Sequence, residues 1–237
     1  MKAKRIGVLL IVLGVVAALG AAGLWLYNDH EEKIAAEYSE TMTQTLLSII
    51  QPAAPTTGVG STHPAGSTPD TPSPTGENAG AASEVTGETA DEASVEVQTL
   101  LDGSIKYITV DQTTYVGILN IPSLNLSLPV NCVWSMASLR YTPCRFSGSI
   151  EKNTIVIGAH RLEGHFGRID TLQEGTAISL LDVEGNEHNY IVSKIETVPP
   201  SATLSVVHSG YALTLFTCTY GGQARVVVRC VRQNDSE

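Results

Sequence analysis

Two strand-like runs joined by a pair of glycines constrain the fold of this chain more than any other feature. The runs cover residues 212–220 and 225–231, and Gly221 and Gly222 lie between them. A two-residue hairpin turn needs positive φ at both central positions, which glycine adopts without steric penalty. With that turn, counting back along both strands places Cys218 directly opposite Arg225, on the same face of a sheet. The segment therefore predicts an antiparallel hairpin that holds a thiol beside a guanidinium.

This pairing points to nucleophilic chemistry. A nearby positive charge favours the thiolate, which is the reactive form of cysteine. Acyl transfer by a thiolate also needs a proton donor for the leaving group, and His160 is the best candidate because it ends a predicted strand, 154–160. Arg225 can contact the oxyanion, and it stays charged at any physiological pH. Cys218, His160 and Arg225 are therefore the predicted catalytic residues.

Neighbouring residues compete for these roles. Arg229 shares the face of Cys218 but lies two pairs farther along the ladder, which favours Arg225. Thr217 and Ala159 adjoin catalytic positions and are candidates for substrate binding. Thr217 points to the other face, however, so packing or hydrogen bonding is the alternative role for its side chain.

A second histidine, His165, follows His160 in the string HRLEGH. The zinc-protease motif has its two histidines four residues apart on a helix, whereas these two are five apart. We therefore assign His165 a supporting or helix-start role and expect neither a metal nor a cofactor. Modulation by calcium stays open.

The C-terminal half of the chain has the pattern of a β domain. β-branched and aromatic residues fill short runs that Gly, Pro, Asn and Asp separate, and only residues 135–139 and 165–172 look helical. We expect a mostly β barrel or closed sandwich with one or two short helices. The predicted strands are 115–121, 126–132, 154–160, 177–183, 188–198, 212–220 and 225–231.

The N-terminal region predicts a membrane anchor. Residues 6–27 are a run of 22 without a charge, long enough as a helix to cross a bilayer. Basic residues precede the run and acidic residues follow it, so residues 1–5 are expected in the cytoplasm and everything after residue 28 outside the cell. No second long apolar run appears, which predicts a single pass.

Composition then divides the rest of the chain. Residues 28–50 predict a juxtamembrane helix or a polar stalk, and residues 51–104 a disordered spacer rich in Pro, Thr, Ser and Gly that lifts a domain off the membrane. Most of the formal charge of −10 belongs to this acidic spacer, because residues 51–99 carry −7 and residues 105–237 only −1. The domain expected at 105–232, with a tail at 233–237, has no basic excess, so nucleic acid is not an expected partner.

The four cysteines leave the disulfide state open. A catalytic Cys218 must stay free, and Cys230 faces the opposite side of the hairpin. Cys144 could pair with Cys132 or with Cys230, or all three could be buried thiols.

Taken together, NTIVIGAHR, LTLFTC and GGQAR, in this order after an apolar N-terminal run, resemble the sortases, surface transpeptidases of Gram-positive bacteria. The resemblance covers residues 115–232 and implies an eight-stranded sortase barrel, without assigning a class. It further implies that Cys218 attacks the Thr carbonyl of an LPXTG-like sorting signal and forms a thioacyl enzyme. His160 would protonate the leaving amine, and Arg225 would stabilise the oxyanion. A peptidoglycan precursor or pilin amine would then accept the acyl group, which would anchor surface proteins to the cell wall.

Two alternatives stay open. A hydrolytic cysteine peptidase would release the acyl group to water, and added amine would distinguish it by the product formed. A non-catalytic surface module that binds peptide would have no need of a reactive thiol.

Overall fold

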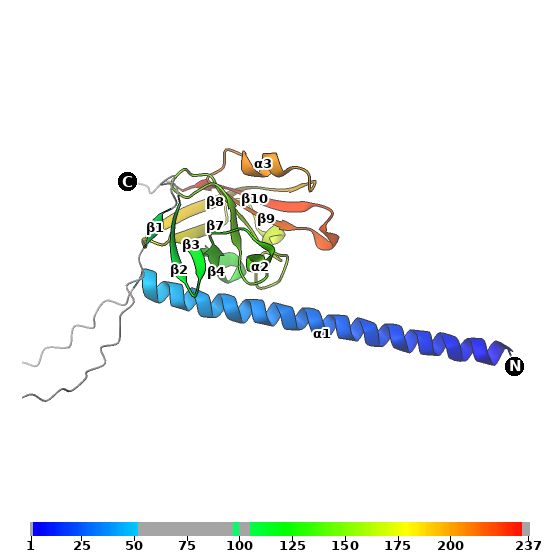
Figure 1. Ribbon diagram of the computed structural model, residues 1–237. Helices are drawn as coiled ribbons and strands as arrows, with labels where there is room; N and C mark the ends of the chain where they lie inside the picture. Colours follow the sequence, from blue (N-terminus) through cyan, green and yellow to red (C-terminus); the bar gives the residue numbers. More distant parts are fainter. Residues whose placement is uncertain (1, 52–96, 100–104, 234–237) are drawn as a thin grey trace, which may run out of the picture. The chain divides into compact units, whose positions relative to one another are not determined.

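The computed structural model describes residues 2–51, 97–99 and 105–233 (Figure 1). Most of the spacer predicted at 51–104 and nearly all of the tail predicted at 233–237 therefore lie outside the described residues.

Eight strands form a closed barrel, as predicted. Going round the barrel, each strand is hydrogen-bonded to the next, and β7 closes the ring by pairing with β3. Two pairs are parallel, β4 with β5 and β6 with β9, and the other neighbours are antiparallel. The order is β3 (Thr113–Ile121), β4 (Leu126–Asn131), β5 (Cys144–Ser147), β6 (Ile155–Gly158), β9 (Leu213–Cys218), β10 (Arg225–Arg232), β8 (Glu187–Val198) and β7 (Ala177–Asp182).

Shorter elements extend this barrel. Strand β2 (Lys106–Val110) pairs with β3, and β1 (Gln98–Thr99) pairs with β2. Helix α2 (Met136–Leu139) occupies the region predicted at 135–139, whereas the region 165–172 contains only the 3₁₀ turn η2 (Ile169–Thr171). Helix α3 (Thr203–Val207), between β8 and β9, was not predicted. Two more 3₁₀ turns are η1 (Pro122–Leu124) and η3 (Tyr220–Gly222).

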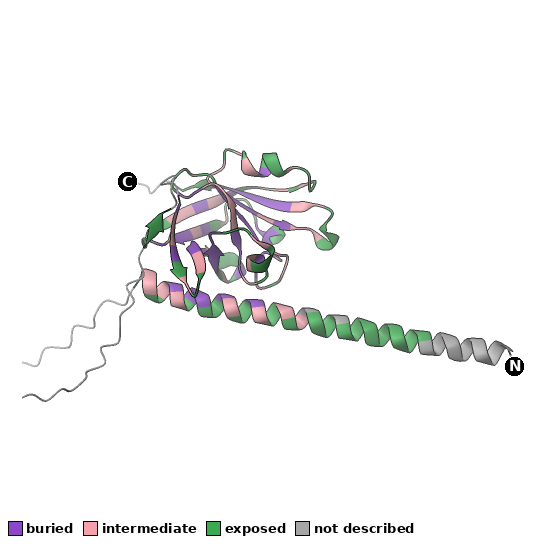
Figure 2. Cartoon of the chain, in the orientation of Figure 1, coloured by how far each residue is buried: buried purple, intermediate pink, exposed green. Residues whose placement is uncertain are grey.

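The alternation of side chains along β6 and β9 separates the core from the outer wall of the barrel. Ile155 and Ile157 of β6 and Leu213 and Leu215 of β9 belong to the main apolar core. The residues between them face outward, where Phe216 packs with a separate cluster that includes Val156, Val206 and Val227. Most residues of β9 and β10 are buried, and these strands are largely purple in Figure 2. Because side chains alternate, His160 and Cys218 continue the outward-facing rows.

Helix α1 (Lys2–Ile50) packs its C-terminal half on the barrel. Ala35, Met42 and Leu46 recur at helical spacing and are buried, and Met42 and Leu46 cluster with core residues of β2, β3 and β7. The hydroxyl of Ser39 donates to the Tyr141 carbonyl (3.0 Å). Residues 28–50, expected as a helix or a stalk, are thus helical and share a packed surface with the barrel.

The anchor at residues 6–27 stays a prediction. In the described part of the chain, no helix meets the length and apolarity needed to cross a membrane.

Candidate active site

Strands β9 and β10 place Cys218 directly opposite Arg225, which confirms the predicted register. The turn between them differs from the prediction. Its loop is four residues long, from Tyr220 to Gln223, because the closing bond runs from the Thr219 amide to the Ala224 carbonyl (3.0 Å). Gly221 and Gly222 do have positive φ, 77° and 71°. The longer loop removes one residue pair, Tyr220 with Gln223, from the end of the ladder. The pairing of Cys218 with Arg225 is therefore unchanged.

Thr219 stiffens this turn. Its carbonyl accepts from the Gly222 amide (2.9 Å), and its hydroxyl accepts from the Ala224 amide (3.0 Å). These bonds fix the segment that joins Cys218 to Arg225, so the two residues are held by a closed loop of hydrogen bonds rather than by a flexible connection.

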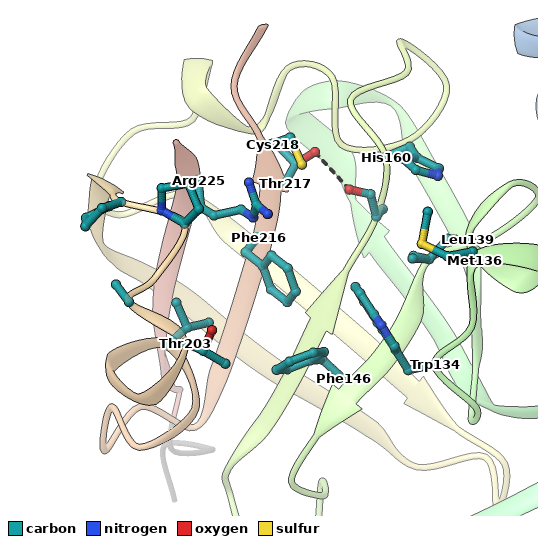
Figure 3. A pocket seen from close by; sticks show the side chains of 15 residues that line it. Trp134, Met136, Leu139, Phe146, His160, Thr203, Phe216, Thr217, Cys218 and Arg225 are labelled. Atoms are coloured by element: carbon teal, nitrogen blue, oxygen red, sulfur yellow. Dashed lines mark hydrogen bonds between the residues drawn. The ribbon is translucent and has the colours of Figure 1, made fainter. Parts of the chain in front are cut away.

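The parallel pairing of β6 with β9 brings His160 to the same end of the barrel. Gly158 is opposite Phe216, and the Ala159 amide donates to the Phe216 carbonyl (3.2 Å). The hydroxyl of Thr217 then donates to the Ala159 carbonyl (2.8 Å). His160 therefore follows the last bonded residue of its strand, close to Cys218. In Figure 3, His160 and Arg225 lie on opposite sides of the thiol.

The two candidate substrate-binding residues both line this site, but each contributes to its framework. Thr217 and Ala159 are buried, and the bond between them joins the two strands immediately below Cys218 and His160. The Thr217 hydroxyl is therefore engaged with the chain itself, in agreement with the hydrogen-bonding alternative.

The two arginines of β10 have different environments. Arg225 is partly exposed, and its guanidinium makes only long bonds to the Gly222 and Ala224 carbonyls (3.4 and 3.3 Å). Arg229 is 3% exposed and binds Glu196 (3.0 Å) together with two carbonyls of α3, at 2.9 and 3.0 Å. Arg229 therefore holds α3 on the barrel, while Arg225 keeps donor capacity beside Cys218.

A groove of about 300 Å³ opens beside Cys218 on the outer wall of the barrel (Figure 3). Its aromatic part consists of Trp134, Phe146 and Phe216, whose ring centroids lie 4.8–5.7 Å apart. Gly158 makes this packing possible, because a Cβ there would lie 2.6 Å from the Phe216 ring and 2.7 Å from the Trp134 ring. These contacts create an apolar surface adjoining a polar, reactive end.

Two short helical segments form the walls of the groove. Met136 and Leu139 of α2 contribute to one wall, and Thr203 and Val206 of α3 contribute to the other. The α2 segment begins at Ser135, whose side-chain oxygen accepts from the Ser138 amide (3.0 Å), as helix-capping serines do.

All four cysteines are free, which answers the disulfide question. Cys132, Cys144 and Cys230 are buried, and burial raises the pKa of each thiol, to about 12 for Cys144 and Cys230. Cys218 is the one thiol that is partly exposed. Its accessibility distinguishes it from the other three as a nucleophile.

His165 does not compete with His160. It is fully buried, its Nε2 donates to the Tyr141 carbonyl (3.1 Å), and burial lowers its pKa to about 4. It is therefore a neutral structural residue at physiological pH. Across the described residues, no group of three or more His, Cys, Asp or Glu has the arrangement of a metal site.

Sequence reasoning missed the groove itself. Trp134, Phe146 and the α3 wall come together from separate parts of the chain, and nothing local marks them. Phe216 carried a usable signal, because it lies two residues before Cys218 and so shares its face of β9.

Comparisons with known proteins give one family. Residues 119–233 match the family model described as the sortase domain. Similar solved structures include sortase C1 from Streptococcus agalactiae (26% identity, 54% of this chain and 72% of that chain, TM-score 0.47) and sortase C from Streptococcus pneumoniae (27%, 53% and 68%, TM-score 0.46). Sortase C from Clostridium perfringens is 25% identical over 51% of this chain and 70% of that chain, with a TM-score of 0.43. No curated protein matched the chain.

Proposed function

Because residues 119–233 belong to the sortase family of cysteine transpeptidases, we propose that this chain cleaves an LPXTG-like sorting signal and transfers the acyl part to an amine. One observation carries the proposal. The partly exposed Cys218 is paired with Arg225 across the hairpin, beside His160 and above an apolar groove.

In the first half-reaction, the Cys218 thiolate adds to the carbonyl carbon of the substrate threonine. Arg225 donates hydrogen bonds to the oxygen as negative charge develops there. The carbon–nitrogen bond then breaks, and the His160 imidazolium gives its proton to the departing amine. A thioester on Cys218 and a neutral His160 remain.

In the second half-reaction, an incoming amine attacks the thioester carbonyl. Neutral His160 takes the proton that the amine loses, the new amide forms, and Cys218 leaves as a thiolate. Protons and charges return to their starting places, so no cofactor enters the cycle. A cell-wall precursor or a pilin lysine has the amine that this step needs.

The groove suits the apolar first part of such a signal. The rings of Trp134, Phe146 and Phe216 offer contact area to a leucine side chain, and Pro199 and Pro200 form part of the rim. A proline in the substrate favours an extended backbone, which fits a groove along a barrel wall.

We further propose that residues 6–27 anchor the chain in the cell membrane of a Gram-positive bacterium, with the barrel outside the cell. Several large apolar side chains of α1 between Leu13 and Tyr27 are exposed to solvent, which is unfavourable unless lipid or protein covers them. The anchor would leave residues 1–5 in the cytoplasm.

The test uses the full-length protein in detergent micelles, a panel of LPXTG-like peptides and triglycine as the amine. Mass spectrometry should find an acyl adduct on Cys218 and the triglycine-linked product. Hydrolysed peptide alone, in the presence of excess triglycine, would show a peptidase instead. Peptide binding without any adduct would show a binding module. The same assay with calcium and with chelator tests modulation by the ion.

A further inference from the structure

The hydrogen bonds that join β6 to β9 end immediately below the catalytic residues. The last ones involve Ala159 and Thr217, one residue before His160 and one before Cys218. Beyond this point the two segments diverge, and one continues into the 161–168 loop while the other enters the 219–224 turn. Some other contact has to fix the distance between these two segments.

Arg161 and Tyr220 make such a contact. Arg161 directly follows His160, and Tyr220 lies two residues after Cys218. The guanidinium carbon of Arg161 lies 4.4 Å from the centre of the Tyr220 ring, well inside the range of a cation–π interaction. This contact therefore joins the histidine segment to the cysteine segment.

The arginine of this pair is itself held in place. Its terminal nitrogen binds the Asp170 carboxylate at 2.6 Å, and its side chain is only 12% exposed. Asp170 belongs to η2, which packs beside the core through the buried Ile169. Arg161 is thus attached to a fixed part of the barrel, with one flat face available to the ring.

Tyr220 lies at the surface of the turn. It is 84% exposed, and its ring lies against the Arg161 guanidinium. Yet its turn is stiffened by Thr219 and supplies the carbonyls of Gly222 and Ala224 that contact Arg225. A displacement of Tyr220 would therefore move both Cys218 and Arg225 relative to His160.

We propose that Arg161 and Tyr220 are positioning residues, whose stacked contact sets the spacing between His160 and the Cys218–Arg225 pair. Neither needs to touch the reacting atoms. This role rests on the proposed transpeptidase chemistry for its kinetic readout, but the contact and its effect on the thiol can be measured without a substrate.

The first test compares variants at Tyr220 in the peptide and triglycine assay. Tyr220→Leu, which keeps apolar bulk but lacks the ring, should lower kcat about 5- to 20-fold with KM nearly unchanged. Tyr220→Phe keeps the ring and should retain about half or more of wild-type kcat. Gln223→Ala, in the same turn, is the matched control and should have no effect. Equal loss in the Phe and Leu variants would overturn the proposal.

A double variant tests whether the two residues act together. Arg161→Ala combined with Tyr220→Leu should be no slower than the slower single variant, because the contact is already broken in each. Losses that multiply would show two independent roles and reject the pair. Thermal unfolding of each variant checks that the fold persists.

A second readout does not depend on the sorting signal. The rate of Cys218 alkylation by iodoacetamide at fixed pH should change several-fold in Tyr220→Leu and stay unchanged in Tyr220→Phe. If the peptides are not turned over at all, the proposed function fails, while this rate still decides the positioning role. Identical alkylation rates in wild type and Tyr220→Leu would contradict it.

Discussion

The groove and the buried parts of the protein each contain a cysteine, an arginine and a histidine, taken from the same short stretches of sequence. The groove set is Cys218, Arg225 and His160, and the buried set is Cys230, Arg229 and His165. In the buried set, every side chain is either paired with other groups of the protein or kept neutral by burial. Burial raises the pKa of the thiol, the arginine binds a carboxylate and carbonyls, and burial keeps the histidine neutral.

The side chains of the groove set are more accessible and less strongly paired. Cys218 is partly exposed, and Arg225 has no carboxylate partner among the described residues. Residue type alone therefore does not make a catalytic group. A side chain can act on a substrate only if its hydrogen-bonding groups and its charge are not already paired with other groups of the protein.

The sharpest test of this difference is the loss of each thiol. Cys218→Ala should lower transpeptidation roughly 10⁴-fold or more, because no other accessible thiol can replace the nucleophile. Cys230→Ala should lower the free energy of unfolding but leave turnover per folded molecule intact. Product formation and chemical denaturation of both variants provide the measurement, and residual acyl adduct in Cys218→Ala would reject its role.

Substitution of Arg229 should affect the stability of the fold, whereas substitution of Arg225 should affect catalysis. Arg229→Ala should destabilise the fold by about 3–5 kcal/mol, because it leaves two α3 carbonyls without their donor and removes one of the two basic partners of Glu196. Urea unfolding measures this loss. A stability change of less than about 1 kcal/mol would contradict the structural role of Arg229.

His165 predicts a pH dependence of stability. Its folded pKa of about 4 lies below the ordinary 6.5, so between these values the unfolded chain binds a proton that the folded chain does not. Stability is therefore full above pH 6.5 and falls by up to about 3 kcal/mol as the pH drops to 4. In His165→Gln, whose amide can still donate to Tyr141, this part of the fall should vanish. Equal slopes in both proteins would argue against it.

Arg225→Lys should have the smallest of these effects, a fall of about 100-fold in kcat/KM. Lysine keeps the charge but cannot present two parallel donors to an oxyanion. The unfolding free energy should change little, because the side chain makes only long bonds. Near-normal turnover would show that charge alone is sufficient.

Local patterns predicted much of the barrel. Strands β3, β4 and β6–β10 follow alternating runs bounded by turn residues, and the Cys218–Arg225 pair follows from counting across a hairpin. The sequence did not predict strand β5 or helix α3, because each is too short to show the periodic pattern of apolar residues that identifies a strand or a helix. The sequence predicted a loop of two residues, whereas the observed loop has four. Positive φ at Gly221 and Gly222 does not by itself determine which residues form the hydrogen bond that closes the loop.

Contacts between distant segments escaped prediction altogether. The Trp134, Phe146 and Phe216 cluster joins three separate segments, and Arg161 meets Tyr220 across 59 positions of sequence. Such contacts depend on the barrel having closed, so no local period encodes them.

The packing of α1 on the barrel determines how residues 6–27 are connected to the domain. Residues 35–46 are fixed against the domain, and Arg140, directly after α2, binds Glu31 through Nε at 2.7 Å. At about 1.5 Å per residue, Glu31 is only about 6 Å along the helix from Tyr27. If residues 6–27 anchor the chain in a membrane, as proposed above, this helix sets the distance between the membrane and the barrel.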